Sequence, residues 1–374
     1  MTRLGDVATY INGFAFAPDD WSENGLPIIR IQDLTGNSYQ MNRYAGEYNP
    51  KYEVNRGDVL ISWSASLGVY VWQGEKALLN QHIFKVIFDK CDVDKSFYVH
   101  QVAAILEKAA SQAHGATMKH LTKPVFDALP FYLPDLPTQQ RIADTLDKVS
   151  EGIGLCRKML GELDLMVKAK FGEMFGALGE DKFNWGMTTL GVCCELNPKR
   201  PRDIPDDMDV SFVAMPSVTE KGQIDTSVIK PYLEVRKGFT YFAENDVLFA
   251  KITPCMENGK GCVAKGLTNA IGAGSTEFHV LRPIHGKSNP YWLYYLTVIP
   301  GFRENARKVM TGTGGQLRVP IAYLDNLPVS LPPIELQEQF ATFVSKIDKS
   351  RLTIQQVLSK MEMVKLALMQ EYFG

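Results

Sequence analysis

Three short motifs in this 374-residue sequence contain residue types that could bind phosphate or transfer a methyl group. The Gly-Lys-Gly of residues 259–261 lacks the spacing of a phosphate-binding P-loop. The glycine-rich run of residues 311–315 follows an expected helix rather than a strand, which is the wrong context for a cofactor-binding loop. The Asn-Pro-Lys-Tyr of residues 49–52 lacks the second proline of the adenine methyltransferase motif and is typical of a turn. None of the three predicts catalysis.

Metal-binding and nucleophilic patterns are also missing from the sequence. The six cysteines follow no C-x-x-C or zinc spacing, and the adjacent pair Cys193 and Cys194 has poor geometry for a disulfide. The six histidines show no H-E-x-x-H pairing, and no Ser-His-Asp set can be assembled. We therefore expect reduced, mostly buried thiols, no metal, no cofactor, and a binding protein rather than an enzyme.

Length and composition predict a globular protein of two or three domains, with 45% hydrophobic and 22% charged residues. No run of about 18 apolar residues and no signal-peptide pattern is present, so we expect a cytoplasmic protein without a membrane span. The formal net charge of −2 argues against non-specific coating of nucleic acid but permits a local basic groove.

The strongest signal in the sequence is an internal repeat. Five residues near the end of the first half recur 198 positions later: Leu129, Pro130, Gln139, Phe175 and Gly176 return as Leu327, Pro328, Gln337, Phe373 and Gly374. Upstream the spacing is 194 for residues 82–87, 188 for residues 57–61 and 186 for Leu4-Gly5. A spacing that grows steadily along the chain predicts a tandem duplication with small loop insertions in the second copy.

Both copies show the same order of expected elements. Short strands rich in Val, Ile and Phe come first, for example at residues 28–31, 59–63, 83–88, 247–250 and 278–281. A helical stretch follows near residues 97–113 or 291–310, and then come a glycine-containing loop and a proline-punctuated strand. The sequence therefore predicts an α+β fold with one mixed globular domain in each copy.

A long helix with a heptad seam ends each copy. Apolar residues alternate in steps of four and three at Ile142, Leu146, Val149, Ile153, Cys156, Leu160, Leu163 and Val167. The second seam comprises Phe340, Val344, Ile347, Ile354, Leu358, Met361 and Leu368, and is interrupted by Arg351 and Lys365. Each helix spans about 38 residues, roughly 57 Å. Such a seam needs a partner, and the other copy provides one.

An antiparallel pair of these helices would place one globular domain near each end and create an approximate two-fold axis. The predicted organisation is a globular domain at residues 1–136, a long helix at 137–176, a second globular domain at 177–333 and a second helix at 334–374. The alternative is that the two helices belong to separate bundles. Matching heptads in both copies favour mutual packing.

Two segments at the helix entries carry a resemblance to a known family. Residues 133–143 contain Leu-Pro followed by Gln five positions after the proline, and residues 331–341 repeat that spacing. Residues 57–62 and 314–316 also fit. Because this entry occurs twice, each time before a heptad helix, the whole chain resembles the specificity subunit of type I restriction-modification systems.

The resemblance implies a division of labour. Each globular domain would be a target recognition domain that reads one half of a bipartite target in double-stranded DNA, and the helices would form a coiled-coil spacer that fixes the unread gap. Two methyltransferase (modification) subunits and, in the full complex, restriction subunits would bind the assembly. Those partners would carry the S-adenosylmethionine and ATP chemistry, which leaves this chain without a cofactor.

Base reading needs Arg, Lys, Gln, Asn and small hydroxyl residues on loops. The candidates in the first domain are Arg30, Gln32, Asp33, Trp63, Ser64, Lys119 and His120. Those in the second are Lys251, Thr253, Asn258, Thr313, Gln316 and Arg318. Corresponding loops hold different residue types, as two readers of different half-sites require. For any single residue, the alternative is an ordinary solvated loop side chain.

The charge of the two domains predicts weak DNA affinity for the isolated chain. Residues 1–137 contain 12 basic and 15 acidic residues, and residues 176–334 contain 17 and 16. Two other functions stay open at this point. One is a helical-bar adaptor that joins proteins without recognising DNA. The other is an enzyme of unrecognised type, which would need a cleft with convergent titratable groups.

Overall fold

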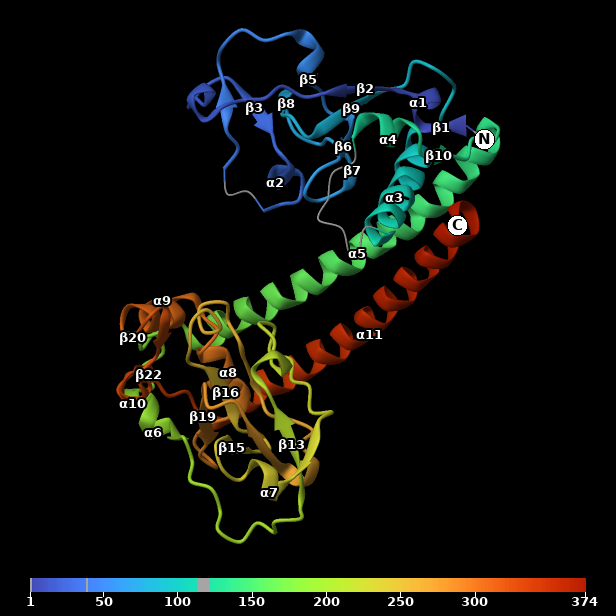
Figure 1. Ribbon diagram of the computed structural model, residues 1–374. Helices are drawn as coiled ribbons and strands as arrows, with labels where there is room; N and C mark the ends of the chain where they lie inside the picture. The colour runs from blue at the N-terminus through green and yellow to red at the C-terminus, as the bar shows by residue number, and fades with distance from the viewer. Residues whose placement is uncertain (1, 38–39, 113–121) are drawn as a thin grey trace. The chain divides into compact units, whose positions relative to one another are not determined.

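The computed structural model describes residues 2–37, 40–112 and 122–374, and the chain divides into two units that each draw on both copies of the repeat (Figure 1). Unit 1 contains Met1–Arg157 with Gln356–Gly374, and unit 2 contains Lys158–Gln355. Each unit therefore holds one globular part and a portion of each long helix. Within the described residues, no helix is long and apolar enough to cross a membrane.

Unit 1 begins with the first globular part. Its strands are β1 Thr2–Arg3, β2 Thr9–Asn12, β3 Leu26–Ile29, β4 Arg43–Tyr44, β5 Glu53–Val54, β6 Val59–Ser62, β7 Gly68–Val71, β8 Ala77–Leu79, β9 Ile83–Ile87 and β10 Pro130–Phe131. Its helices are α1 Leu4–Val7, α2 Ile31–Leu34, α3 Lys95–Gln112, α4 Lys123–Asp127 and the start of α5 Leu136–Phe175. The Asn-Pro-Lys-Tyr motif forms the short 3-10 helix η2 Pro50–Tyr52, and Asn49 Oδ1 accepts from the Lys51 N–H at 3.1 Å.

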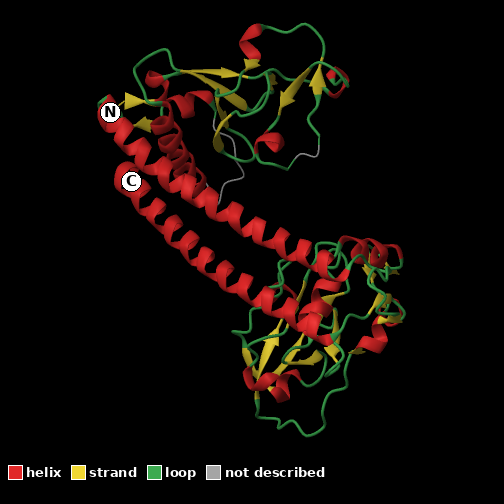
Figure 2. Ribbon diagram, turned by 180° about the vertical axis from the view of Figure 1, so that it is seen from behind, coloured by secondary structure: helices red, strands yellow, loops and turns green. Residues whose placement is uncertain are grey.

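Unit 2 contains the second globular part. Its strands are β11 Met187–Thr189, β12 Cys194–Leu196, β13 Asp209–Val213, β14 Ile229–Pro231, β15 Thr240–Ala243, β16 Val247–Ala250, β17 Gly261–Val263, β18 Ile271–Gly274, β19 Phe278–Pro283, β20 Thr311–Thr313, β21 Gln316–Arg318 and β22 Pro328–Ser330. Its helices are α6 Leu190–Cys193, α7 Tyr232–Val235, α8 Pro290–Leu296, α9 Pro300–Lys308, α10 Ile321–Asp325 and the start of α11 Ile334–Phe373. In each unit the strands lie in the globular part, and portions of the two long helices lie beside that part (Figure 2).

The two globular parts share one strand order, which confirms the internal repeat. Unit 1 has the sheets β2-β9-β6-β7 and β4-β3-β8-β5, and unit 2 has β12-β19-β16-β17 and β14-β13-β18-β15. In the second sheet of each unit, the central pair is parallel and both outer pairs are antiparallel. The long helices α5 and α11 each contain 40 residues and start 198 positions apart.

The strand registers correct one part of the sequence alignment. Ile61 pairs with Phe84 in unit 1, and Phe249 pairs with His279 in unit 2. Because Ile61 and Phe249 are equivalent, Phe84 is equivalent to His279, at a spacing of 195. The predicted spacing of 194 for this strand was therefore wrong by one residue. Such a slip exchanges the two faces of a strand.

Backbone contacts explain why the Leu-Gly and Leu-Pro pairs recur. The Leu4 N–H donates to the Leu129 carbonyl at 3.0 Å, and the Leu190 N–H donates to the Leu327 carbonyl at 2.9 Å. These bonds join the start of each globular part to the strand before its long helix. A Cβ on Gly191 would lie 1.9 Å from Asp325 Oδ1, so only glycine fits there without displacement.

In unit 1 the two long helices pack antiparallel along their predicted seams. Gly152 of α5 gives room to the end of the Met361 side chain of α11, because a Cβ at that position would lie 2.1 Å from the methionine methyl carbon. Phe373 of α11 also meets Phe97 of α3, with ring centroids 5.6 Å apart. At the surface, Arg157 forms an ion pair with Glu362 at 2.7 Å. The heptad prediction is confirmed for this part of the pair.

In unit 2 the end of α5 meets the start of α11. Phe340 packs against Phe171 and Phe175, with ring centroids 5.4 Å apart in both contacts. Arg351, which interrupts the apolar seam, lies within it and forms ion pairs of 2.6 Å with Asp164 of α5 and Asp348 of its own helix. Only 13% of the Arg351 side chain is exposed, so this bridge is intermediate between a weak surface pair and a buried one.

Candidate nucleic-acid interface

A β-hairpin built from β20 and β21 projects from the second globular part. Its two turn residues, Gly314 and Gly315, have φ angles of 61° and 77°. Two successive residues with positive φ are the requirement of the tight type I′ hairpin turn, which explains the two glycines at this position. The last pair before the turn is Thr313 opposite Gln316, and both residues are exposed.

This hairpin is tied to the loop that follows β16. The Thr253 N–H donates to the Leu317 carbonyl at 3.0 Å, and the Thr253 hydroxyl donates to the Gly315 carbonyl at 2.7 Å. The Val319 N–H donates to the Lys251 carbonyl at 2.9 Å. The structure thus brings together five of the six residues predicted in the second domain, which we call the hairpin cluster: Lys251, Thr253, Thr313, Gln316 and Arg318.

Two further side chains hold the base of the hairpin. The Arg318 guanidinium donates to both carboxylate oxygens of Glu277 at 2.9 and 2.8 Å, and this bonding lowers the pKa of Glu277. The buried His279 ring contacts the Val319 carbonyl at 2.9 Å and the Asn197 amide at 3.2 Å. Burial lowers the pKa of His279, so the neutral ring, with Nε2 as donor, fits these partners. Arg318 and His279 therefore position the hairpin.

Asn258, the sixth predicted residue of the second domain, lies in the turn after the hairpin cluster's loop. Its backbone N–H donates to the Pro254 carbonyl at 2.9 Å, and the residue is exposed. A small hollow of about 170 Å³ lies beside Lys251 and is lined by Asn197, Thr276 and Tyr241, among others. The sequence reasoning missed these three, although Asn197 follows directly on a strand.

The equivalent loop of unit 1 contains Trp63 and Ser64. The Trp63 N–H donates to the His82 carbonyl at 3.2 Å, and the Lys251 N–H donates to the Glu277 carbonyl at 2.9 Å. These matching bonds confirm that Trp63 and Lys251 occupy corresponding positions. The Trp63 ring stacks on Phe84 at 5.6 Å, and its indole N–H donates to Asn12 Oδ1 at 3.2 Å. Ser64 is buried. Lys119 and His120 lie outside the described residues.

Arg30 is the N-cap of the short helix α2 of unit 1, and Gln32 and Asp33 lie within that helix. Arg30 forms an ion pair with Asp33 at 3.0 Å, and the Asp33 carboxylate also accepts from the Arg30 N–H at 2.8 Å. Since 2% of the Asp33 side chain is exposed, this pair fixes the start of α2. Gln32 is the exposed member of the three.

No metal site emerges from the described residues, where no group of three or more His, Cys, Asp or Glu side chains is placed to hold an ion. The adjacent Cys193 and Cys194 are both free thiols and buried. Burial raises the pKa of Cys193 to about 11, which makes it a poor nucleophile. The side chains of the hairpin cluster offer hydrogen-bonding groups and charge, on loops held by a duplicated scaffold.

The fold consists of two copies of one globular part with long helices, and comparison with known sequences gives its family. The family model described as "Type I restriction modification DNA specificity domain" matches residues 1–164 and again residues 184–362. The chain belongs to this family, and it contains the domain twice.

Curated relatives are specificity subunits. The EcoAI specificity subunit of Escherichia coli is 42% identical over 159 residues, which are 41% of this chain and 26% of that protein. The Escherichia coli EcoEI subunit is 38% identical over 166 residues, 44% of this chain and 27% of its own length. The MjaVIII subunit of Methanocaldococcus jannaschii is 23% identical over 93% of this chain and 85% of its own. The chain thus aligns with about a quarter of the two Escherichia coli proteins.

Solved structures share the fold along the whole chain. The S subunit of a type I restriction-modification system from M. genitalium superposes with a TM-score of 0.54 at 12% identity, covering 100% of this chain and 95% of that one. A chain from a type I restriction-modification complex gives 0.52 at 17% identity, with 100% and 96% covered. At these identities the likeness concerns the fold alone, including its helical spacer.

Proposed function

We propose that this chain is the DNA-recognition subunit of a type I restriction-modification complex, in which each globular part reads one half of a split target. One observation carries the proposal. The two parts share strand order and backbone contacts at the loops after β6 and β16, but the loops present different side chains, such as Trp63 and Lys251. A duplicated scaffold with divergent loops suits two half-sites of different sequence.

Four exposed candidates and the partly exposed Lys251 do the reading in this proposal, and the ion-paired ones support them. Gln32, Lys251, Asn258, Thr313 and Gln316 offer polar groups to base edges. Arg30 with Asp33, and Arg318 with Glu277, shape the loops. The predicted domain boundaries at residues 136, 176 and 333 stay part of the proposal. The chain itself is non-catalytic and uses no cofactor, and a cytoplasmic location stays a prediction.

Sequencing of methylated DNA tests the recognition proposal. In cells that carry this chain with its cognate methyltransferase gene, we expect one methylated motif made of two short specified halves separated by a fixed unspecified gap. Cells with the methyltransferase alone are the control and should lack that motif. A continuous motif without a gap would contradict the two-reader arrangement. No sequence-specific methylation at all would favour an adaptor role.

The spacer helices carry a duplicated apolar strip that suits two copies of one partner. Met159, Leu165 and Met166 of α5 are exposed, as are their repeat equivalents Val357, Met363 and Val364 of α11. Exposure matches within the pairs and is 67% for Leu165 and 63% for Met363. At about 100° per residue, Leu165 and Met363 lie on the helix face opposite the seam, and the other four residues lie about 80° from the seam on one flank. We assign one methyltransferase subunit to each strip.

Replacing one strip should remove one partner. The double variant Leu165→Asp with Met166→Asp is expected to bind one methyltransferase subunit where the unchanged chain binds two, because buried carboxylates would be unpaired at the contact. Light scattering of the purified complex gives the stoichiometry. The control is Val228→Asp with Leu233→Asp. These two exposed apolar residues of unit 2 belong to neither long helix. Retention of two subunits by the strip variant would contradict this docking site.

A further inference from the structure

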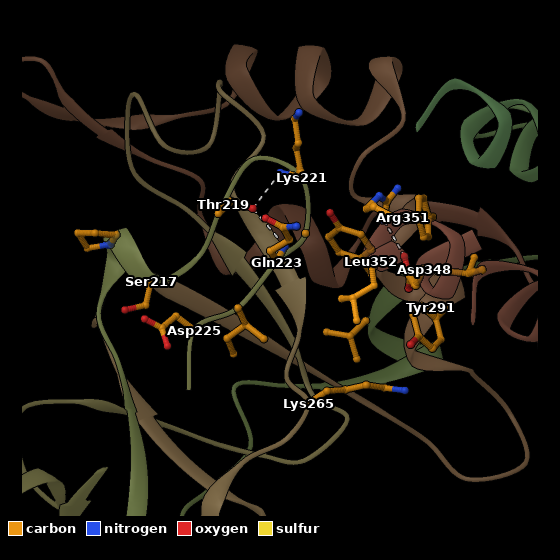
Figure 3. Close-up of a pocket in the computed structure, with 17 residues that line it drawn as sticks. Ser217, Thr219, Lys221, Gln223, Asp225, Lys265, Tyr291, Asp348, Arg351 and Leu352 are labelled. Atoms are coloured by element: carbon orange, nitrogen blue, oxygen red, sulfur yellow. Dashed lines mark hydrogen bonds and ion pairs between the residues drawn. The ribbon is translucent and has the colours of Figure 1, made fainter. Parts of the chain in front are cut away.

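A cavity of about 740 Å³ lies within unit 2, between the second globular part and the spacer helix (Figure 3). One wall is the loop of residues 216–225, which leads from β13 to β14. A second wall is α8, which contributes Tyr291, Tyr294 and Tyr295. The third is α11, through Val344, Asp348, Arg351 and Leu352. The volume falls in the range of pockets that take a drug-sized group or a few side chains, about 300–1,000 Å³.

Several polar groups that line this cavity are already bonded within the chain. Arg351 is held by Asp348 and Asp164, each at 2.6 Å. In the loop, the Thr219 hydroxyl oxygen accepts from the N–H groups of Lys221 and Gln223 at 3.2 and 3.1 Å. A specific small-molecule site typically presents converging polar groups that await a ligand. In this cavity, several polar groups of the lining already form hydrogen bonds or ion pairs with other groups of the chain.

Two exposed lysines of the cavity lining differ from these bonded groups. Lys221 and Lys265 are exposed, and across the described residues neither takes part in an ion pair within 4.0 Å. The Lys265 ammonium lies 4.6 Å from the ring centroid of Tyr291. The carboxylate of Asp225 is engaged by the Ser227 N–H at 2.9 Å. Leu352 is 60% exposed at the cavity's edge. An apolar surface flanked by lysines is complementary to an acidic segment with an apolar anchor.

Among the described residues, the first copy of the repeat does not reproduce the α8 and α11 walls of this cavity. By the shared contacts with Gln139 and Gln337, Tyr291 and Tyr295 are equivalent to Ser96 and His100. Those two side chains both bind Asp147, at 2.6 and 2.7 Å. On the long helix, Leu352 is replaced by a glycine in the equivalent position 154. The cavity therefore distinguishes the second copy from the first.

We propose that this cavity receives a segment of the partner protein, with an acidic side chain between Lys221 and Lys265 and an apolar side chain against Leu352. The inference rests on the proposed function, in which that partner is the methyltransferase subunit. Its consequence is asymmetry. The two partner copies dock on repeated helix strips, but only the copy on unit 2 has this additional anchor. The second-copy site therefore binds more tightly than the first.

Calorimetric titration of the cognate methyltransferase subunit into the full chain, without DNA, tests this asymmetry. We expect two sites of different affinity in the unchanged chain. In the double variant Lys221→Glu with Lys265→Glu, the tighter site should weaken about tenfold or more, and the weaker site should stay unchanged. Leu352→Asn should weaken the same site with little dependence on salt, because it removes apolar contact. Near-ultraviolet circular dichroism confirms that each variant is folded.

The control is Lys237→Glu with Lys308→Glu, which makes the same charge change at two exposed lysines of unit 2 outside the cavity. It should leave both affinities unchanged. Two affinities that stay the same in the cavity variants, or that fall equally, would overturn the anchor and leave the proposed function standing. A cavity that takes a free metabolite would give that unchanged result. Absence of any binding to the unchanged chain would overturn both proposals.

Discussion

A chain with both Lys251→Ala and Gln316→Ala is expected to lose on the order of 100-fold in affinity for its target once it is assembled with its partners. Each well-placed contact to a base edge is worth about 1–3 kcal/mol, so two together account for this loss. Gln316 is exposed at the hairpin tip, and Lys251 lies in the loop bonded to that hairpin. Competition binding with duplexes that carry single base changes provides the measurement.

The pattern of lost discrimination is more informative than the affinity. If unit 2 reads one half of the target, this variant should tolerate base changes in that half and still reject changes in the other. Arg307→Ala with Lys349→Ala removes two exposed basic residues of the same unit outside the hairpin cluster, and serves as the control. It should weaken binding to all sequences by a small, similar factor, as loss of a phosphate contact does. Equal loss of discrimination in both halves would contradict the assignment.

The long helices could be predicted closely because their signal is local. A heptad seam is set by spacing along one helix, so the residues that it names are among the least exposed of α5 and α11 in the structure. The same holds for the residues near the end of each copy that recur at a spacing of 198, because no insertion separates them. The alignment of β19 with β9 was one residue off because the insertion that shifts it lies in a loop, where the sequence pattern does not fix the position.

The site residues were harder to predict because their roles depend on partners distant in sequence. Arg318 was chosen as a base reader, but its guanidinium is bound by Glu277, 41 residues away. Trp63 was chosen for its place after a strand, which is correct, and the ring then packs on Phe84. Arg351 interrupts the apolar heptad, and its ion-pair partner Asp164 lies on the other helix, where the spacing along one helix cannot reveal it. Type and loop position select candidates, and tertiary contacts decide which of them stay free.

The variant Gln337→Leu is expected to lower the free energy of unfolding of unit 2 by about 3 kcal/mol. The fully buried Gln337 side chain accepts from the Asn289 N–H at 2.8 Å and donates to the carbonyls of Lys287 and Pro332 at 3.0 and 2.8 Å. Leucine of similar size would leave one buried and two part-buried backbone groups without these bonds, and an unsatisfied buried group costs about 1–3 kcal/mol, less where water reaches it. Amide hydrogen exchange at Asn289 provides a local readout.

Gln339→Leu, two residues further along the same helix at an exposed position, is the matched control and should change stability by less than about 0.5 kcal/mol. The repeat supplies a second test. Gln139 accepts from the Asp94 N–H and donates to the Pro134 carbonyl, both at 2.8 Å, so Gln139→Leu should destabilise unit 1 in the same way. Normal stability in both variants would show that the repeated glutamine is not a structural clamp.

This clamp connects the sequence motif to the mechanism of recognition. The glutamine joins the first turn of each spacer helix to the N-terminus of α3 or α8 in the adjoining globular part. A reader that is fixed to its spacer holds its loops at a set position on the DNA, and a reader that can rotate does not. Gln337→Leu should therefore relax the fixed gap between the two half-sites before it abolishes binding. Methylation of targets whose gap differs by one base pair from the normal one would reveal that loss. Strict retention of the normal gap would show that the glutamine contributes to the stability of unit 2 but does not set the gap.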